Sequence, residues 1–180
     1  MKEKTFFDLV SEVTQRLNIP AILIGGFAVN YHGLMRQTQD VDFLMVEEDY
    51  NKAKPLFGKE GCREVIRNNL FARLENKKML PSELDIVFVN EETFEGILED
   101  AETTEISGKR FKVPSLDHLL ALKLHAMKQN LRRRGFRDLT DVLDLAEKNQ
   151  IDVKGERFQE LCLKYAGKET YRIIQELLKK

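Results

Sequence analysis

Residues 21–45 read AILIGGFAVNYHGLMRQTQDVDFLM, and they carry the strongest structural signals in the chain. Its apolar start ends in Gly25 and Gly26, a pattern typical of a buried strand that turns directly into a helix. The apolar segment 40–46 indicates a second buried strand, and its first and third residues are Asp40 and Asp42. Residues two apart on a strand point to the same side, so the two carboxylates are expected to project together. Either they are solvated at a strand end, or they jointly hold a cation.

The rest of the chain alternates strands and helices at first and is helical afterwards. The predicted helices are 6–17, the segment after the glycines, 47–58, 91–100, 115–130, 137–148, 154–165 and 168–178. Residues 62–90 read as extended, and 103–113 read as a hairpin with its turn at Ser107 and Gly108. We predict an α/β (α+β) fold with a small, mostly antiparallel or mixed sheet flanked by helices. Residues 1–113 form this core, and residues 114–180 form an all-helical lobe packed on it as a single compact unit.

Net charge, cysteine spacing and the lengths of the apolar runs exclude several classes of protein. The 180 residues carry a formal net charge of −1, so no global field attracts nucleic acid or a membrane. Cys62 and Cys162 are far apart with no CxxC spacing, which predicts buried free thiols rather than a zinc site or a disulfide framework. Neither a signal peptide nor an apolar run of about 18 residues is present, so we expect a cytoplasmic protein with no membrane partner.

A third acid strengthens the cation interpretation. Asp85 lies at the start of another apolar strand, in SELDIVFV. If that strand neighbours 40–46, three carboxylates converge and can bind two cations, which clamp the attacking and leaving oxygens of a phosphoryl transfer. Such hard oxygen ligands suit Mg²⁺, and Asp85 is also a candidate general base. Gly25 and Gly26 either let backbone amides approach a phosphate or simply form a tight turn.

These motifs resemble a known superfamily when they are taken in order. The strand, Gly-Gly, helix, Asp-x-Asp and distal acid are similar to those of the DNA polymerase β-type nucleotidyltransferases. The downstream blocks KLHA and RDLTD resemble those of a small prokaryotic branch that includes abortive-infection toxin-type enzymes. The resemblance covers roughly residues 20–145, which makes it more specific than any single motif.

The resemblance implies Mg²⁺-dependent transfer of a nucleotidyl group from an NTP to an acceptor hydroxyl. The acceptor would be an RNA 3′ end, a protein or a small molecule, and a toxin-like role with an antitoxin-type protein partner follows by analogy. Two Mg²⁺ ions, with Mn²⁺ as a substitute, would be held by the catalytic acids Asp40, Asp42 and Asp85. The implied nucleotide-binding residues are Gly25, Gly26, Arg36, Thr38, Lys123, Arg137 and Asp138. Many relatives carry Ser after the first glycine, whereas Gly26 offers only backbone donors.

Other interpretations compete with this one. A catalytically inactive nucleotide-binding module of the same fold, acting with a partner, fits the same motifs. A two-metal phosphatase or nuclease is the third alternative, although the Gly-Gly phosphate seat counts against it. Arg132, Arg133 and Arg134 are either an anchor for RNA or a solvated helix end. His118 and His125 share a helical face, but two histidines without a third ligand predict partly buried neutral side chains rather than a metal site.

Overall fold

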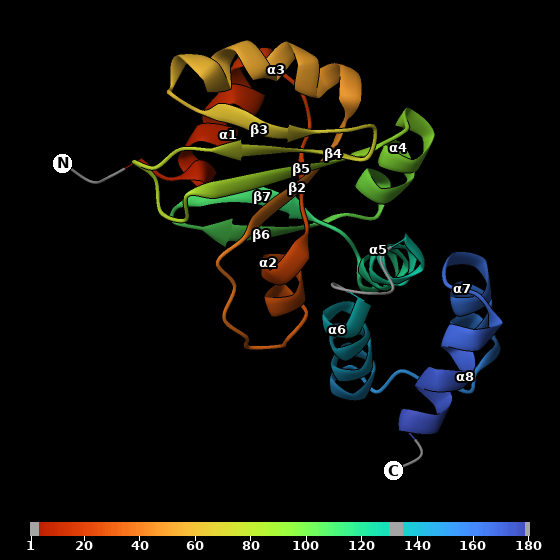
Figure 1. Ribbon diagram of the computed structural model, residues 1–180. Coiled ribbons are helices and arrows are strands. Elements are labelled where there is room, and N and C mark those ends of the chain that lie inside the picture. The colour runs from red at the N-terminus through yellow and green to blue at the C-terminus, as the bar shows by residue number, and fades with distance from the viewer. Residues whose placement is uncertain (1–3, 130–134, 179–180) are drawn as a thin grey trace. The chain divides into compact units, whose positions relative to one another are not determined.

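The computed structural model describes residues 4–129 and 135–178. Two compact units divide the chain. The first contains residues Met1–Ala28 and Arg36–Ser115, and the second contains Val29–Met35 and Leu116–Lys180. Figure 1 shows the strands of the first unit and the helices of both.

Within the described residues, the strands of the first unit form one mixed sheet of seven strands. The strands are β1 (Ile22–Leu23), β2 (Val41–Val46), β3 (Arg63–Arg67), β4 (Phe71–Glu75), β5 (Glu83–Val89), β6 (Glu102–Ile106) and β7 (Lys109–Val113). Their order is β3-β4-β5-β2-β1-β7-β6. The pairs β2–β5 and β1–β7 are parallel, and the other neighbours are antiparallel. The predicted mixed sheet is confirmed.

Two turn residues explain the predicted hairpin between β6 and β7. Ser107 has φ 53° and Gly108 has φ 77°, and both values lie in the left-handed region that tight two-residue hairpin turns require. Glycine adopts this conformation without a steric penalty, which is why the Ser-Gly pair predicts the turn from the sequence. The hairpin forms one edge of the sheet.

One face of the sheet is covered by two helices, α1 (Phe6–Leu17) and α3 (Glu47–Lys59), which Figure 1 shows lying together on it. Alternate residues of the strands, such as Val41, Phe43 and Ile86, are fully buried in this core. The first helix starts at a capping box, in which Thr5 and Asp8 bond each other's backbone amide. Because strand side chains alternate, Asp42 and Asp85 project from the opposite face.

In its described part, the first unit has two further helices, which follow β1 and β5. The short helix α2 (Gly25–Tyr31) follows β1 directly, as the Gly-Gly pattern predicts, and it continues into the second unit. The helix α4 (Glu91–Glu99) follows β5, and the Asn90 side chain caps it by accepting a bond from the Thr93 amide at 2.9 Å. Cys62 is buried as a free thiol, as predicted.

The second unit is helical throughout its described part after residue 115. Its helices are α5 (Leu116–Gln129), α6 (Gly135–Lys148), α7 (Glu156–Tyr165) and α8 (Lys168–Leu177). Buried side chains on these helices, among them Leu124, Leu145, Phe158 and Cys162, form its core. Among the helices described, none combines the length and apolar character needed to cross a membrane.

Candidate functional site

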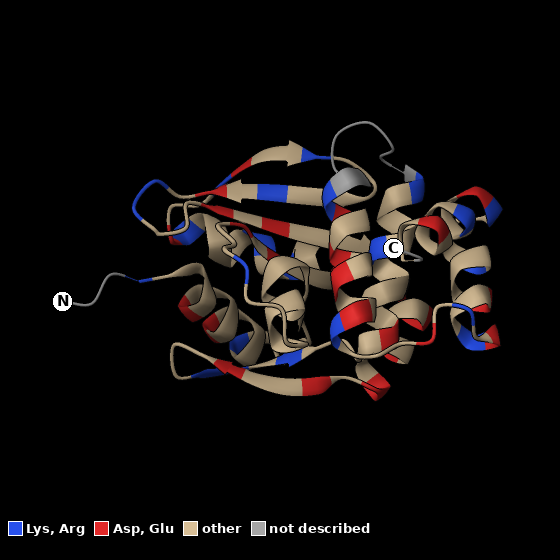
Figure 2. Ribbon diagram, turned by 90° about the horizontal axis from the view of Figure 1, so that it is seen from below, with Lys and Arg blue, Asp and Glu red and all other residues tan. Residues whose placement is uncertain are grey.

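A row of charged side chains runs across three neighbouring strands. Asp42 on β2 lies in register with Asp85 on β5, and Asp85 lies in register with Arg73 on β4. Register partners project from the same face of a sheet, so these three side chains share one face. Figure 2 shows acidic and basic segments on neighbouring strands of this sheet. The strand of Asp85 neighbours that of Asp42, which is the condition under which the sequence predicts that the acids meet.

The carboxylate of Asp42 lies directly against the backbone of Gly25. The Ile24 amide donates to the Asp42 carbonyl at 2.9 Å, which fixes the end of β1 beside β2. A Cβ at Gly25 would overlap Oδ2 of Asp42 and lie 2.8 Å from its Cγ. Gly25 also has φ +63°, which an L side chain rarely adopts. Position 25 therefore needs glycine for two independent reasons, the close approach of the Asp42 carboxylate and the positive φ.

Gly26 lies against Thr38 in a similar way. A Cβ at Gly26 would lie 2.6 Å from the Thr38 Cβ and would overlap its hydroxyl oxygen. The hydroxyl of Thr38 thus fills the space that a serine side chain at position 26 would need, which accounts for the departure from the Gly-Ser pattern. Thr38 donates to the Asp40 carbonyl at 3.3 Å, and half-buried Arg36 precedes it in the same connection to β2.

Arg73 holds Asp85 through two hydrogen bonds. Its Nε and Nη2 donate to Oδ1 and Oδ2 of Asp85, each at 2.7 Å, and its Nη1 lies 3.2 Å from Glu83. Asp85 is only 4% exposed, so the pair is largely shielded from water. The bonds to Asp85 raise the pKa of the Arg73 guanidinium, and the charges of Glu83 and Asp40 raise it further. Arg73 therefore stays charged and neutralises one carboxylate of the acidic face.

The donor set of this face suits a hard divalent cation. Asp40 and Asp42 are half-buried, their oxygens are the ligands that Mg²⁺ prefers, and the close approach of Gly25 holds Asp42 in one position. Among the described residues, no three acidic, histidine or cysteine side chains are grouped so that they could hold a metal. The bidentate bond to Arg73 supplies a physical reason, because it directs both oxygens of Asp85 toward the guanidinium. Asp40 and Asp42 thus offer oxygens of the kind that Mg²⁺ prefers, whereas both oxygens of Asp85 are bonded to Arg73.

Sequence reasoning missed Arg73 and Glu83. The signal for Glu83 is present, because Glu83-Leu84-Asp85 repeats the acid–apolar–acid pattern of residues 40–42, and the register places the two patterns side by side. Arg73 gives no comparable signal. It stands in the alternating strand FARLE, where an arginine between two buried residues ordinarily faces water.

In the second unit the structure brings Lys123 together with two acids of α6. The Lys123 ammonium lies 2.8 Å from Asp138 and 2.7 Å from Asp141, and Asp141 is 2% exposed. The motifs KLHA and RDLTD are therefore joined by ion pairs between α5 and α6. An ammonium has three N–H donors, so these contacts use two of them and leave one for a further ligand.

Replacing Lys123 by alanine is expected to destabilise the second unit by about 3–5 kcal/mol, because it leaves the buried carboxylate of Asp141 without its cation. Urea unfolding, followed by circular dichroism, measures this loss. Lys128→Ala removes an exposed lysine from the same helix and is the matched control. Equal stability of the two variants would show that the ion pairs contribute nothing net.

The other candidate residues of the second unit differ in their exposure to solvent. Arg137 is exposed on α6, His118 is half-buried and His125 is exposed on α5. Arg132, Arg133 and Arg134 lie outside the described residues. Figure 2 shows how the charges are distributed along the described helices.

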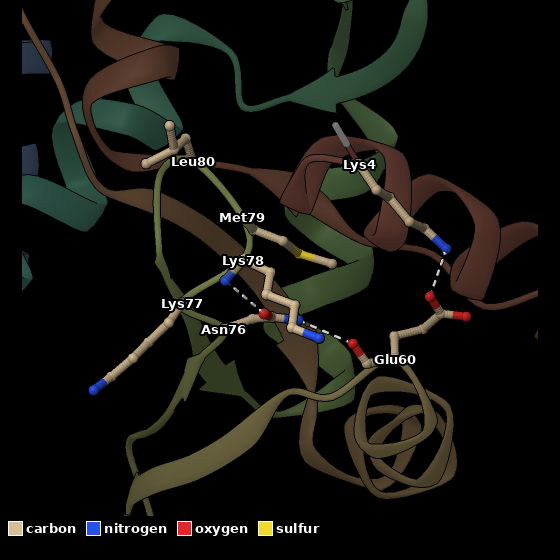
Figure 3. A pocket seen from close by; sticks show the side chains of 7 residues that line it. All are labelled: Lys4, Glu60, Asn76, Lys77, Lys78, Met79 and Leu80. Carbon is tan, nitrogen blue, oxygen red and sulfur yellow. Dashed lines mark hydrogen bonds and ion pairs between the residues drawn. The ribbon is translucent and has the colours of Figure 1, made fainter. Parts of the chain in front are cut away.

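A pocket of about 610 Å³ also lies in the first unit, away from the acidic row (Figure 3). It is lined by Lys4, Glu60 and the residues of the β4–β5 turn, and its lining includes none of the candidate site residues. The Asn76 amide donates to the Glu60 carbonyl at 2.9 Å, and Lys4 donates to the Glu60 carboxylate at 2.9 Å. The first contact ties the turn to the end of α3, and the second ties the N-terminal segment to the same residue.

Comparisons with known proteins agree with this geometry. A family model described as "Uncharacterised nucleotidyltransferase" matches residues 8–177. No curated protein sequence matches the chain. The antibiotic-resistance factor ANT(2″)-Ia is similar in structure, with a TM-score of 0.56 and 13% identity over 97% of this chain and 91% of that one.

Two further structures share the fold at similar identity. An antigenic nucleotidyltransferase-like protein from Paracoccidioides brasiliensis has a TM-score of 0.53 and 17% identity, covering 85% of this chain and 82% of that one. The lincomycin-bound lincosamide antibiotic adenylyltransferase LnuA has a TM-score of 0.52 and 14% identity, covering 77% and 93%. The nucleotidyltransferase resemblance is confirmed, and the narrower likeness to toxin-type enzymes stays a prediction.

Proposed function

The chain belongs to the family described as uncharacterised nucleotidyltransferases, and from that premise we propose a Mg²⁺-dependent enzyme that moves a nucleotidyl group from an NTP to an acceptor hydroxyl. The observation that supports this proposal is the register of Asp42 with Asp85, because these two acids share one face of the sheet. Asp40 and Asp42 are the proposed ligands of the metal, with Asp85 as the third acid. When bound, Mg²⁺ neutralises charge that develops on the transferred phosphate.

The remaining chemistry falls to residues of the chain. The acceptor oxygen forms a bond to the α-phosphorus, the bond from that phosphorus to the bridging oxygen of the β-phosphate breaks, and pyrophosphate leaves. Asp85 accepts the proton of the acceptor hydroxyl, for which the carboxylate must be released from Arg73. Burial of Asp85 at 4% exposure keeps competing water away from that oxygen.

Nucleotide-contacting residues are proposed for each unit taken by itself. In the first, Gly25 and Gly26 offer backbone amides to the phosphates, and Thr38 offers a hydroxyl in the place where many relatives have serine. Arg36 precedes it and supplies a positive charge. In the second unit, the proposed nucleotide-contacting residues are Lys123, Arg137 and Asp138, and Lys123 has an N–H donor left for a ligand.

A second candidate function rests on the Arg73–Asp85 pair. A carboxylate held by two bonds of 2.7 Å is poorly placed to act as a base, which favours an inactive nucleotide-binding module acting with a partner. Release of pyrophosphate distinguishes the two, because a binding module takes up NTP and does not cleave it. A toxin-like role with an antitoxin-type partner is a further proposal that the same purified protein can test.

The test is incubation with each α-³²P-labelled NTP and Mg²⁺, with cell RNA, cell protein or hydroxylated small molecules as acceptors. The small-molecule arm includes tobramycin and lincomycin, which are named as ligands in structures of the same fold. We expect label to move to one acceptor class and pyrophosphate to be released in equal amount. NTP binding without pyrophosphate release in every arm would establish the binding module instead.

A further inference from the structure

Arg73 is the cation nearest to the proposed base, and its position follows from the sheet register. It stands opposite Asp85 in the antiparallel pairing of β4 with β5. Both oxygens of the carboxylate accept from it at 2.7 Å, a side-on geometry that uses Nε and one terminal nitrogen of the guanidinium. A metal at the same carboxylate would have to tolerate a full positive charge within hydrogen-bond distance of its ligand atoms.

Resting on the proposed function, we infer that Arg73 is a positioning residue that blocks Asp85 until a divalent cation bound at Asp40 and Asp42 displaces it. In the resting protein Arg73 neutralises the acid that would otherwise complete the metal site. After displacement, Asp85 is available as a ligand or base. The chain thereby couples assembly of its catalytic centre to arrival of the metal with its nucleotide.

The displaced guanidinium has a second anchor. Nη1 of Arg73 already lies 3.2 Å from Glu83, whose side chain is 43% exposed. Glu83 precedes Asp85 by two residues on the same strand, so both acids project from the same face and a rotation of the Arg73 side chain can exchange one for the other. The ion pair with Glu83 keeps the charge of Arg73 satisfied while Asp85 is released.

The balance of charges also favours exchange. Asp42, Glu83 and Asp85 place three carboxylates on this face, and Arg73 pairs with Glu83 and Asp85 together. A divalent cation brings two positive charges to the same group. It therefore offsets the attraction between Arg73 and Asp85, which a neutral ligand could not do.

Mn²⁺ binding tests this inference without any turnover. Free Mn²⁺ is titrated by electron paramagnetic resonance against the wild-type protein, Arg73→Gln and the double variant Arg73→Gln/Asp85→Asn. We expect Arg73→Gln to bind Mn²⁺ at least about tenfold more tightly in the absence of nucleotide. A factor of ten corresponds to one pKa unit, which is the smallest shift that a neighbouring arginine ordinarily causes at a carboxylate. The double variant should lose this gain, because the released oxygens are those of Asp85.

The matched control is Arg63→Gln. Arg63 pairs with Glu75 at 3.7 Å on the same sheet and its side chain is 70% exposed, so its loss removes a similar charge without freeing Asp85. Arg73→Lys, which keeps the charge but not the two-bond geometry, reports on the pair if Arg73→Gln fails to fold. It should fall between the wild type and Arg73→Gln.

Three outcomes overturn the inference. Unchanged Mn²⁺ affinity in both Arg73→Gln and Arg73→Lys, with wild-type Mn²⁺ binding in the presence of a non-hydrolysable NTP, refutes the block and leaves the proposed function standing. An equal gain of Mn²⁺ affinity in Arg63→Gln would show that the gain in Arg73→Gln comes from the change in net charge alone. No Mn²⁺ binding by any variant, with or without the NTP, refutes the proposed function and this inference together.

Discussion

Replacing Asp42 by asparagine is expected to abolish Mg²⁺-dependent nucleotide transfer, lowering turnover by about 10³-fold, while the protein stays folded. Asp42 is close in the chain to Asp40, which it follows by two residues, and it lies in register with Asp85 on the neighbouring strand. The amide keeps the shape and one oxygen but lacks the charge that holds a dication. Transfer of α-labelled nucleotide at saturating NTP measures the loss.

The stability of the Asp42→Asn variant separates a functional from a structural role. Adjacent carboxylates repel in the metal-free fold, so neutralising one should leave the free energy of unfolding unchanged or slightly raised. Asp100→Asn alters an exposed acid at the end of α4 and serves as the control for charge alone. A loss of several kcal/mol with activity preserved would instead assign Asp42 to a structural ion pair.

The strand and helix pattern could be predicted because its signals are local. Gly25 and Gly26 mark a strand-to-helix turn, Ser107 and Gly108 adopt the left-handed backbone of a hairpin, and the structure has both features where the sequence places them. Each signal depends on a few adjacent residues and on backbone sterics. The fold class followed from these elements.

The neighbours of the acids could not be predicted in the same way. The order β3-β4-β5-β2-β1-β7-β6 brings together strands that are some 40 residues apart in the sequence, such as those of Asp42 and Asp85. The parallel register of β2 with β5 then decides whether the two acids meet, and a shift by one residue would reverse their faces. The order of the motifs suggested that these two acids meet only because it resembles that of the nucleotidyltransferase superfamily.

The ion-pair partners of Arg73 and Lys123 could not be predicted from the sequence either. The pattern placed Lys123 on a helix, but its ion pairs with Asp138 and Asp141 depend on how α5 and α6 pack. Arg73 read as an ordinary solvent-facing strand residue until the register set it against Asp85. A charged side chain has no local signal for its partner, because Coulomb attraction acts between whichever groups the fold brings together.

Replacing Gly25 by alanine is expected to reduce nucleotide transfer by about 100-fold or more, although the change adds a single methyl group. The new Cβ would overlap Oδ2 of Asp42 and lie 2.8 Å from its Cγ, so the carboxylate or the backbone has to move. A displacement of about 1 Å at a catalytic group is enough for a loss of this size. Alanine at φ +63° adds a backbone penalty of about 1–2 kcal/mol.

The control for Gly25→Ala is Gly96→Ala. Gly96 lies within α4, and a Cβ there would have no neighbour within 4 Å. That variant should keep full activity and gain about 0.5–1 kcal/mol of stability, since alanine is the better helix former. Activity, Mn²⁺ affinity and urea unfolding are measured on both. If Gly25→Ala lost its 1–2 kcal/mol of stability but kept wild-type Mn²⁺ affinity and turnover, the position of the Asp42 carboxylate would not matter to the reaction, and the metal site proposed at Asp40 and Asp42 would be wrong.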